Sequence, residues 1–393
     1  MTMAKRVGIV GGGVYGLSIA YYLSEFGDDD LEITAFERGA LASETTGYSA
    51  GIVRHHYTNR VQIETAIRGR ELLEGFESVA GGDGGFRQNG YLVLTDADGV
   101  DEFRALVDRQ RRAGLEVDLV EATDLESFLP GIDPAGVALG AYEPQAGFAD
   151  PYLVATDYAT GARENGVEIR TATPVTDLVT DGTAVTAVET SEGREPVDIV
   201  VNAAGPWGRE IASMAGVDVP LEWYESKVAV LRGDEPYGVE TPTLSDHSES
   251  PDMYLKPEPG GDVLVGGIDR PPVDRAAGLQ GVDESFLRAV GDRLDSRLPT
   301  FADAAVVDSW SGVISVTPDS HQIVGVPTGV DNLYNALGGS GHGFKEAPAF
   351  GESIALSILG EDPRIDLEAY RLERFADGDA LSGVSEKSYG GDE

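Results

Sequence analysis

Apolar and polar positions at the beginning of the chain follow two different periods. A short apolar run over residues 6–10 is followed by a glycine-rich turn, and apolar residues then recur at helical spacing from Tyr15 to about Phe26. A second apolar run follows at residues 32–36. Short apolar runs bounded by turns are typical of buried strands, and a period near 3.6 is typical of a helix. The pattern therefore predicts a strand, a tight turn, a helix and a second strand.

The rest of the chain mixes helical and extended patterns. Helical spacing predicts further helices at residues 61–79, 101–114, about 151–164 and 347–359. Extended patterns predict strands at residues 91–94, 167–170, 197–202, 226–231 and 253–267, within a strand-rich stretch from about 220 to 310. The Ser-, Thr- and Gly-rich segment 39–60 is expected to be loop with a helix start, and the polar, acidic tail after Ala376 is expected to fray.

Two sets of glycines precede predicted helices. Gly11, Gly13 and Gly16 lie where the first strand passes into the first helix, and a second glycine run occupies residues 338–343. Backbone N–H groups at a helix N-terminus favour a pyrophosphate. Glu37, at the end of the second strand, could accept both ribose hydroxyls of an adenosine. The glycine spacing alone is a weak signal, but together with the strand, the helix and the acid it predicts a dinucleotide site.

Charge is the unusual part of the composition. The 393 residues are enough for two domains, and 29 Lys plus Arg stand against 68 Asp plus Glu, for a net charge of -39. A charge this large repels itself unless salt screens it, to a length of about 3 Å at molar ionic strength. Few lysines and no cysteine accompany the acidic residues, and this composition predicts a protein from a salt-accumulating halophile. It also argues against binding nucleic acid or an anionic membrane surface.

Several kinds of site are excluded by missing residues. Without cysteine there is no disulfide, no thiolate nucleophile and no Cys-ligated metal. The His, Asp and Glu residues show no metal-ligand spacing, and no Ser/His/Asp set suggests acyl transfer. The N-terminus has no secretory pattern, and no apolar run approaches the ~20 residues of a membrane span. We therefore expect a cytoplasmic protein without a metal site or a membrane span.

Four segments carry a resemblance to a known family. They are the glycine turn with Glu37, the segment Ser49–Tyr57, the strand tip Asn202–Trp207, and Thr317-Pro318-Asp319 together with Gly341–Lys345. In these motifs the chain resembles the D-amino-acid oxidase superfamily of flavoproteins, and within it the sarcosine oxidase and dimethylglycine/sarcosine dehydrogenase group. The resemblance covers nearly the whole chain and implies FAD rather than NAD.

The resemblance also implies a fold and a set of cofactor contacts. It implies an α/β protein in which an FAD-binding Rossmann-type (glutathione-reductase-like) domain, residues 1–85, 147–218 and 308–393, is interleaved with an antiparallel-sheet α+β substrate domain, residues 86–146 and 219–307. The residues expected to contact FAD come from all parts of the first domain. They are Gly11, Gly13, Val14, Tyr15, Gly16, Glu37, Arg38, Thr46, Ser49, Ala50, Gly51, Ile52, Val175, Ala204, Gly205, Trp207, Gly312, Gly338, Gly341, His342, Gly343, Phe344 and Lys345.

Members of this group oxidise an amine by transferring a hydride from the carbon beside the nitrogen to flavin N5. When the amine is an N-methyl amino acid, its carboxylate must be held by Arg or Lys. Arg54 and Lys345 match the residues that hold this carboxylate in the family. The alternatives are a structural ion pair for Arg54 and a surface salt bridge for Lys345. Tyr254 is a candidate wall of the substrate site, or a half-buried strand residue. His55 is a candidate base, although a histidine here is more often a hydrogen-bonded wall residue.

Three departures from the family narrow the expectation. Gly312 and Tyr48 stand where relatives attach FAD through Cys or His, so FAD is expected to be bound non-covalently. Val265 stands where oxidases carry a lysine that assists the reaction with oxygen, which favours a dehydrogenase. Lys227 or Lys256 could still supply that charge from elsewhere.

These observations predict an FAD-dependent oxidoreductase that acts on the CH–NH bond of a small amino acid, with an N-methyl amino acid such as sarcosine preferred. One alternative is an FAD-dependent 2-hydroxy-acid dehydrogenase, which the histidines at positions 55 and 56 keep open because a hydroxyl must lose its proton. Another is a non-catalytic flavin-binding subunit or assembly factor. The sequence leaves open whether the electron acceptor is O2 or a carrier, and whether the chain forms a homo-oligomer or needs a partner subunit.

Overall fold

The computed structural model describes residues 4–28, 30–275, 281–301 and 303–381. Its N-terminal part is a unit of β1 (Lys5–Val10), α1 (Val14–Phe26) and β2 (Leu31–Phe36). β1 is parallel to both β2 and β12 (Ile199–Asn202), so that Val10 lies opposite Phe36 on one side and Asn202 on the other. The carboxyl ends of the three strands therefore meet at one edge of the sheet.

This sheet has six strands in the order β18-β19-β12-β1-β2-β8 among the described residues. Its remaining strands are β8 (Glu168–Arg170) and β19 (Leu333–Leu337), which are parallel to the centre, and β18 (Ile323–Gly325), which is antiparallel. α1 packs against both α5 (Pro151–Glu164) and α8 (Ala347–Leu359). Because neighbours cover α1 on several sides, it is apolar nearly all round rather than amphipathic. A Cβ on Gly351 would lie 2.4 Å from Ser18 Oγ, so α1 and α8 approach closely.

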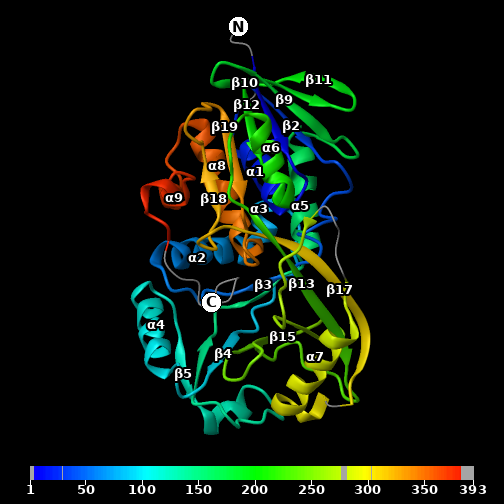
Figure 1. Ribbon diagram of the computed structural model, residues 1–393, viewed down its shortest axis with the longest axis vertical. Coiled ribbons are helices and arrows are strands. Elements are labelled where there is room, and N and C mark those ends of the chain that lie inside the picture. Colours follow the sequence, from blue (N-terminus) through cyan, green and yellow to red (C-terminus); the bar gives the residue numbers. More distant parts are fainter. Residues whose placement is uncertain (1–3, 29, 276–280, 302, 382–393) are drawn as a thin grey trace.

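A second, eight-stranded sheet occupies the lower half of Figure 1. In spatial order its strands are β17 (Ala305–Val316), β13 (Glu222–Arg232), β16 (Val263–Gly266), β15 (Met253–Pro257), β14 (Thr243–Asp246), β4 (Tyr91–Thr95), β6 (Leu139–Glu143) and β5 (Asp118–Glu121). Neighbouring strands are antiparallel except β4 and β14, which are parallel. The predicted antiparallel sheet is therefore mixed at its centre.

Side chains of this sheet alternate between two cores, as the period of a strand requires. Tyr91 and Val93 pack with α4 (Val100–Arg112), whereas Leu92 and Leu94 pack with α7 (Glu284–Arg297). The two helices thus cover opposite faces (Figure 1).

The remaining strands and α-helices complete the fold. They are the pair β3 (Ile52–Val53) and β7 (Gly147–Phe148), the sheet of β9 (Val175–Asp181), β10 (Ala184–Thr190) and β11 (Gly193–Pro196), and the helices α2 (Arg60–Glu74), α3 (Phe76–Ala80), α6 (Gly208–Met214) and α9 (Arg374–Asp377). None of the helices in the described ranges is long and apolar enough to cross a membrane.

The predicted fold class, a Rossmann-type sheet interleaved with an α+β unit, is confirmed, and the predicted helix at 347–359 coincides with α8. Two local predictions were wrong, and one helix was not predicted. The helix expected over 61–79 is interrupted at Gly75, and the extended stretch 253–267 is two strands joined by a turn. α7 lies in a stretch expected to be rich in strands, and its start was marked by Asp283, whose side chain accepts the Phe286 N–H.

The structure bears on the predicted domain boundaries at one point. The predicted boundary between residues 307 and 308 falls inside β17, which runs through residues 305–316, and the division into two domains stays a prediction. The part of the tail after residue 381 lies outside the described residues.

Candidate active site

A cavity of about 500 Å³ begins at the carboxyl ends of β1, β2 and β12 and reaches β13, β15 and β17 of the second sheet. Every residue expected to contact cofactor or substrate lines this cavity except Gly16 and His55. The lining comes from all four segments that carried the resemblance. Residues more than three hundred positions apart in the sequence therefore share one cavity.

The structure gives different reasons for glycine at the three positions of the first turn. Gly11 has φ +117°, and a Cβ there would lie 2.3 Å from the Ala203 carbonyl oxygen. A Cβ on Gly16 would lie 2.0 Å from the Gly11 carbonyl oxygen. Backbone packing requires these two glycines. Gly13 has an ordinary φ of -87°, and its Cβ would meet only Thr46 Oγ1, at 3.1 Å. At Gly13, therefore, the absent side chain mainly leaves space in the cavity.

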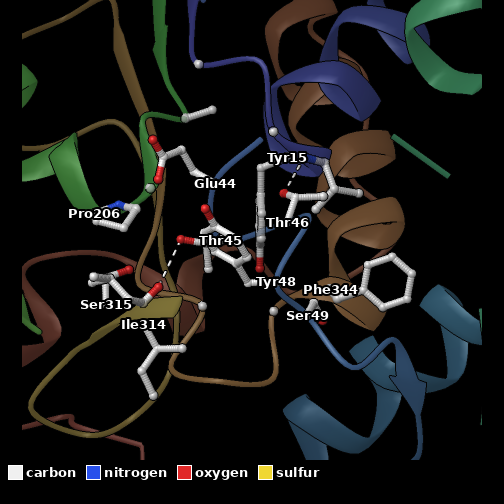
Figure 2. Close-up of a pocket in the computed structure, with 18 of the residues that line it drawn as sticks. Tyr15, Glu44, Thr45, Thr46, Tyr48, Ser49, Pro206, Ile314, Ser315 and Phe344 are labelled. Carbon is white, nitrogen blue, oxygen red and sulfur yellow. Dashed lines mark hydrogen bonds between the residues drawn. The ribbon is translucent and has the colours of Figure 1, made fainter. Parts of the chain in front are cut away.

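Polar groups at this end of the cavity suit a phosphate and a ribose. The Val14 N–H donates to Thr46 Oγ1 at 3.1 Å, and Figure 2 shows Thr46 beside the first turn of α1. Glu37 accepts the Gly12 N–H at 2.7 Å and the Gly39 N–H at 2.6 Å, one with each carboxylate oxygen. These bonds fix the carboxylate, and each oxygen keeps a further acceptor site. Arg38 stacks on Trp207, with its guanidinium carbon 3.4 Å from the ring centroid.

The second glycine run folds into a tight loop before α8, and we call Gly338–Lys345 the cofactor loop. Gly338 and Gly341 have φ of +72° and +77°, where an L side chain would be strained. A Cβ on Gly343 would lie 2.9 Å from the Gly339 Cα, and the His342 N–H donates to the Gly339 carbonyl oxygen at 2.8 Å. α2 presses on the loop so closely that a Cβ on Gly69 would lie 1.9 Å from the Lys345 carbonyl oxygen.

Arg54 and Lys345 are brought together on one aromatic ring. The Arg54 guanidinium carbon lies 4.8 Å, and Lys345 Nζ 5.3 Å, from the centroid of the Tyr57 ring. Both cations are buried, at 6% and 3% exposure, and both line the cavity. Arg54 donates to the His56 carbonyl oxygen, and Lys345 to the His342 carbonyl oxygen. Two buried cationic side chains that line the same part of the cavity can both donate to one anionic ligand there.

Tyr254 lines the same cavity from β15. Its ring lies along β16, since a Cβ on Gly266 would lie 2.4 Å from the Tyr254 hydroxyl oxygen. Arg270, Tyr91 and Ser226 also line the cavity, although they were not predicted to do so. No pattern in the sequence marks them, because they reach the cavity through the pairing of distant strands.

His55 belongs to a buried cluster behind Arg54. Glu143 of β6 accepts the His55 backbone N–H and the Gln110 side-chain amide, each at 3.0 Å. Burial alone would raise the pKa of the Glu143 carboxyl, but the neighbouring His55 and His56 rings hold it well below its usual range. Burial lowers the pKa of His56. The cluster thus contains an ionised carboxylate that supports the segment carrying Arg54. Neither histidine lines the cavity.

The structure also shows where the positions that depart from the family pattern lie. A Cβ on Gly312 would lie 2.7 Å from the Tyr48 Cβ, so these two positions, 264 residues apart, are in contact at the cavity wall. Tyr48 is one of the lining residues labelled in Figure 2. Lys227 pairs with Asp283 and Lys256 with Glu258, each at 2.8 Å. Among the lysines of the described ranges, only Lys345 lines the cavity.

Comparisons with known proteins place this geometry in context. A family model described as FAD dependent oxidoreductase matches residues 6–356. The chain is similar to mitochondrial dimethylglycine dehydrogenase of Rattus norvegicus, with 28% identity over 403 residues, 97% of this chain and 46% of that protein. It is also similar to sarcosine oxidase subunit beta of Arthrobacter sp, with 28% identity over 381 residues, 94% of this chain and 91% of that one.

The fold is also similar to that of a solved structure. The structure of L-proline dehydrogenase from P. horikoshii superposes with a TM-score of 0.87 and 26% identity, covering 96% of this chain and 99% of that one. The chain spans slightly less than half, 46%, of the length of the dimethylglycine dehydrogenase that it matches.

Proposed function

The chain belongs to the family of FAD-dependent oxidoreductases, and from this premise we propose that it oxidises the CH–NH bond of a small amino acid, with an N-methyl amino acid such as sarcosine preferred. The observation that carries the proposal is the placement of Arg54 and Lys345 on the Tyr57 ring inside the cavity. Both side chains can donate charge-assisted hydrogen bonds to one substrate carboxylate. Dimethylglycine, sarcosine and proline, which the relatives' names mention, are amino acids whose nitrogen carries more than one carbon.

The cofactor is FAD, and the residues present fit it. We place the pyrophosphate at the first turn of α1, where Gly13 leaves space, and the adenosine ribose at Glu37. The isoalloxazine then lies beside the cofactor loop, whose backbone donors and helix N-terminus suit its pyrimidine edge. Non-covalent binding is proposed because the chain has no cysteine, and Tyr48 and Gly312 occupy the positions used for attachment in relatives.

When bound, FAD supplies the acceptor for the hydride that leaves the carbon beside the substrate nitrogen. The protein's own part is to hold that carbon in place and to exclude water. Arg54 and Lys345 fix the carboxylate end, and the rings of Tyr91 and Tyr254 form apolar walls around the rest. Such positioning supplies much of the rate where the cofactor carries the chemistry.

The arrangement of histidines favours an amine over a 2-hydroxy acid. A hydroxyl must lose its proton as hydride leaves, which calls for a base in the cavity. Of the histidines in the described residues, His342 alone lines the cavity, and both of its ring nitrogens lie within hydrogen-bonding distance of other groups, Nε2 at 2.9 Å from the Ser320 carbonyl oxygen and Nδ1 at 3.2 Å from Glu346 Oε2. An amine needs no such base once it is neutral.

An anaerobic visible spectrum tests the proposal on protein purified in molar KCl. Sarcosine should bleach the bound FAD, and glycolate or lactate at the same concentration should not. Bleaching by the hydroxy acids alone would replace the proposed substrate class. Bleaching by none of a panel of amines and hydroxy acids would favour the flavin-binding subunit or assembly factor.

The electron acceptor is tested with the same sample. Because Lys345 is the lysine that lines the cavity in the part of the chain that the structure describes, and because it faces the proposed substrate carboxylate, we propose a dehydrogenase that reduces dyes faster than O2. Reoxidation in air faster than by an equal concentration of dye would overturn this part. The sequence leaves open whether a partner subunit is needed, and the name of one relative raises the same question; activity of the purified chain alone decides it.

A further inference from the structure

A buried carboxylate that the proposed function does not use lies directly behind the cofactor loop. Glu346, the residue after Lys345, is 0% exposed and does not line the cavity. Its Oε1 accepts the Gln62 side-chain amide at 3.3 Å, and Gln322 donates to its Oε2. Side chains from α2, from the segment before β18 and from the loop itself therefore converge on one carboxylate.

Glu346 is connected to the cavity by its contact with His342. Glu346 Oε2 lies 3.2 Å from His342 Nδ1, and His342 Nε2 lies 2.9 Å from the Ser320 carbonyl oxygen. The ring of His342 is thus fixed at both nitrogens while the residue lines the cavity. Because the His342 carbonyl oxygen also accepts Lys345 Nζ at 3.1 Å, the same contacts set the position of that ammonium group.

The charge of Glu346 persists in the buried site. Burial alone would raise the pKa of its carboxyl, but the charge of His342 and the hydrogen bond with it lower that pKa to about 2. A desolvated carboxylate is costly, and a glutamine of the same shape would fill the site without that cost. A purely packing role therefore does not account for a glutamate here.

We propose that Glu346 is a positioning residue for FAD, which orients the cofactor loop through His342 and whose fixed negative charge opposes negative charge on the pyrimidine edge of the isoalloxazine. Lys345, which faces the cavity, acts in the opposite sense. This inference rests on the proposed placement of the isoalloxazine beside the cofactor loop, and it is independent of which substrate the enzyme oxidises.

Sulfite is the probe, because it adds to flavin N5 and leaves negative charge on the ring without needing an amine substrate. In the holoprotein, Glu346→Gln should tighten sulfite binding on the order of tenfold, since one buried unit charge is removed. The flavin midpoint potential should move to a more positive value. Glu346→Asp keeps the charge, so its sulfite affinity should stay within about twofold of wild type.

Glu352→Gln is the matched control. Glu352 lies on α8, is 5% exposed, pairs with Arg68 at 2.6 Å and does not line the cavity. Removal of this second buried carboxylate should leave sulfite affinity unchanged. A tightening equal to that of Glu346→Gln would overturn the proposal, because it would show a general effect of net charge.

Lys345→Met separates the two ways in which the inference can fail. If Lys345→Met weakens sulfite binding and Glu346→Gln changes nothing, the flavin lies at the loop and the role of Glu346 is refuted. If neither variant has an effect, the placement of the flavin is wrong and the inference falls with it. Should Glu346→Gln fail to fold, Glu346→Asp carries the test, because a shift of more than about fivefold with the charge retained would contradict an electrostatic role.

Discussion

Gly13→Ala should release FAD while the protein stays folded. The added Cβ would meet only Thr46 Oγ1, at 3.1 Å, and the φ of -87° suits alanine. The exchange of glycine for alanine at this cap position costs about 1 kcal/mol or less of stability. In the proposed site, however, the methyl group stands where the pyrophosphate approaches the backbone. Loss of one or two charge-assisted hydrogen bonds, each worth about 1.5–3 kcal/mol, corresponds to a roughly tenfold to ten-thousandfold loss of FAD affinity.

Gly16→Ala is the opposite case and serves as the comparison. Its Cβ would lie 2.0 Å from the Gly11 carbonyl oxygen, which is backbone that cannot rotate away. Overpacking of this kind costs about 1–3 kcal/mol or more. Gly16→Ala should therefore lower the thermal midpoint of the apoprotein, whereas Gly13→Ala should not.

Two measurements on apoprotein in molar KCl distinguish these effects. Thermal unfolding by circular dichroism reports stability, and the quenching of FAD fluorescence on titration reports affinity. If Gly13→Ala binds FAD as tightly as wild type, the pyrophosphate does not lie at the first turn of α1. If it lowers the thermal midpoint as much as Gly16→Ala does, the space at Gly13 is structural and the reasoning fails.

Four other predictions follow from named contacts. Arg54→Met and Lys345→Met should each raise the KM for sarcosine at least about tenfold with FAD retained, because each removes a charge-assisted bond to the carboxylate, and steady-state kinetics with FAD absorbance checks this. Asp319→Ala should lower stability by about 3–5 kcal/mol in denaturant titrations, since it deprives the buried Arg374 of the two 2.8 Å hydrogen bonds that Asp319 accepts. Burial and the nearby His342 charge lower the pKa of His321 to about 4, so the unfolded state binds more protons than the folded state between pH ~4 and ~6.5. Stability should therefore fall as pH falls through that window. In acid titrations, His321→Gln should flatten the pH dependence of stability. Dilution from molar KCl to about 0.1 M should lower the thermal midpoint, because a net charge of -39 is then less screened.

Each of these has a result that contradicts it. An unchanged KM in either cation variant would remove that residue from the carboxylate site. Asp319→Ala with wild-type stability would mean that the pair contributes nothing net. An unaltered pH dependence in His321→Gln would assign the acid sensitivity to other groups, such as His56, whose lowered pKa acts in the same direction. A midpoint insensitive to salt would refute the halophile prediction.

The sequence predicted the parts of the site that are local. The turn at Gly11–Gly16 and the cofactor loop are short segments in which steric contacts explain the glycines. Their residues, and the acid at Glu37, could therefore be named without a structure. The pairings around them could not be predicted. Glu143 is 88 positions from His55, and Gln62 is 284 positions from Glu346.

The misassigned elements have related reasons. The break at Gly75 leaves the apolar spacing intact, so only the backbone reveals it. α7 was hidden because the strands around it dominate the composition of that stretch, although Asp283 marked its start. Gly16 was expected to touch the cofactor, but it does not line the cavity and serves the approach of α1 to the turn.

The close packing of α1 on α8 has a consequence for biosynthesis. Gly351 contacts Ser18, so the two glycine loops that frame the cavity are held by helices from opposite ends of the chain. A ribosome that adds about 5–20 residues per second needs roughly 15–65 s to extend the chain from the first loop at Gly16 to the second at Gly338. During that interval the surface of the first helix that α8 covers has no partner, and the cofactor has only half a site. Flavin loading is therefore a late event, and a chain that stops before the second loop should emerge without colour.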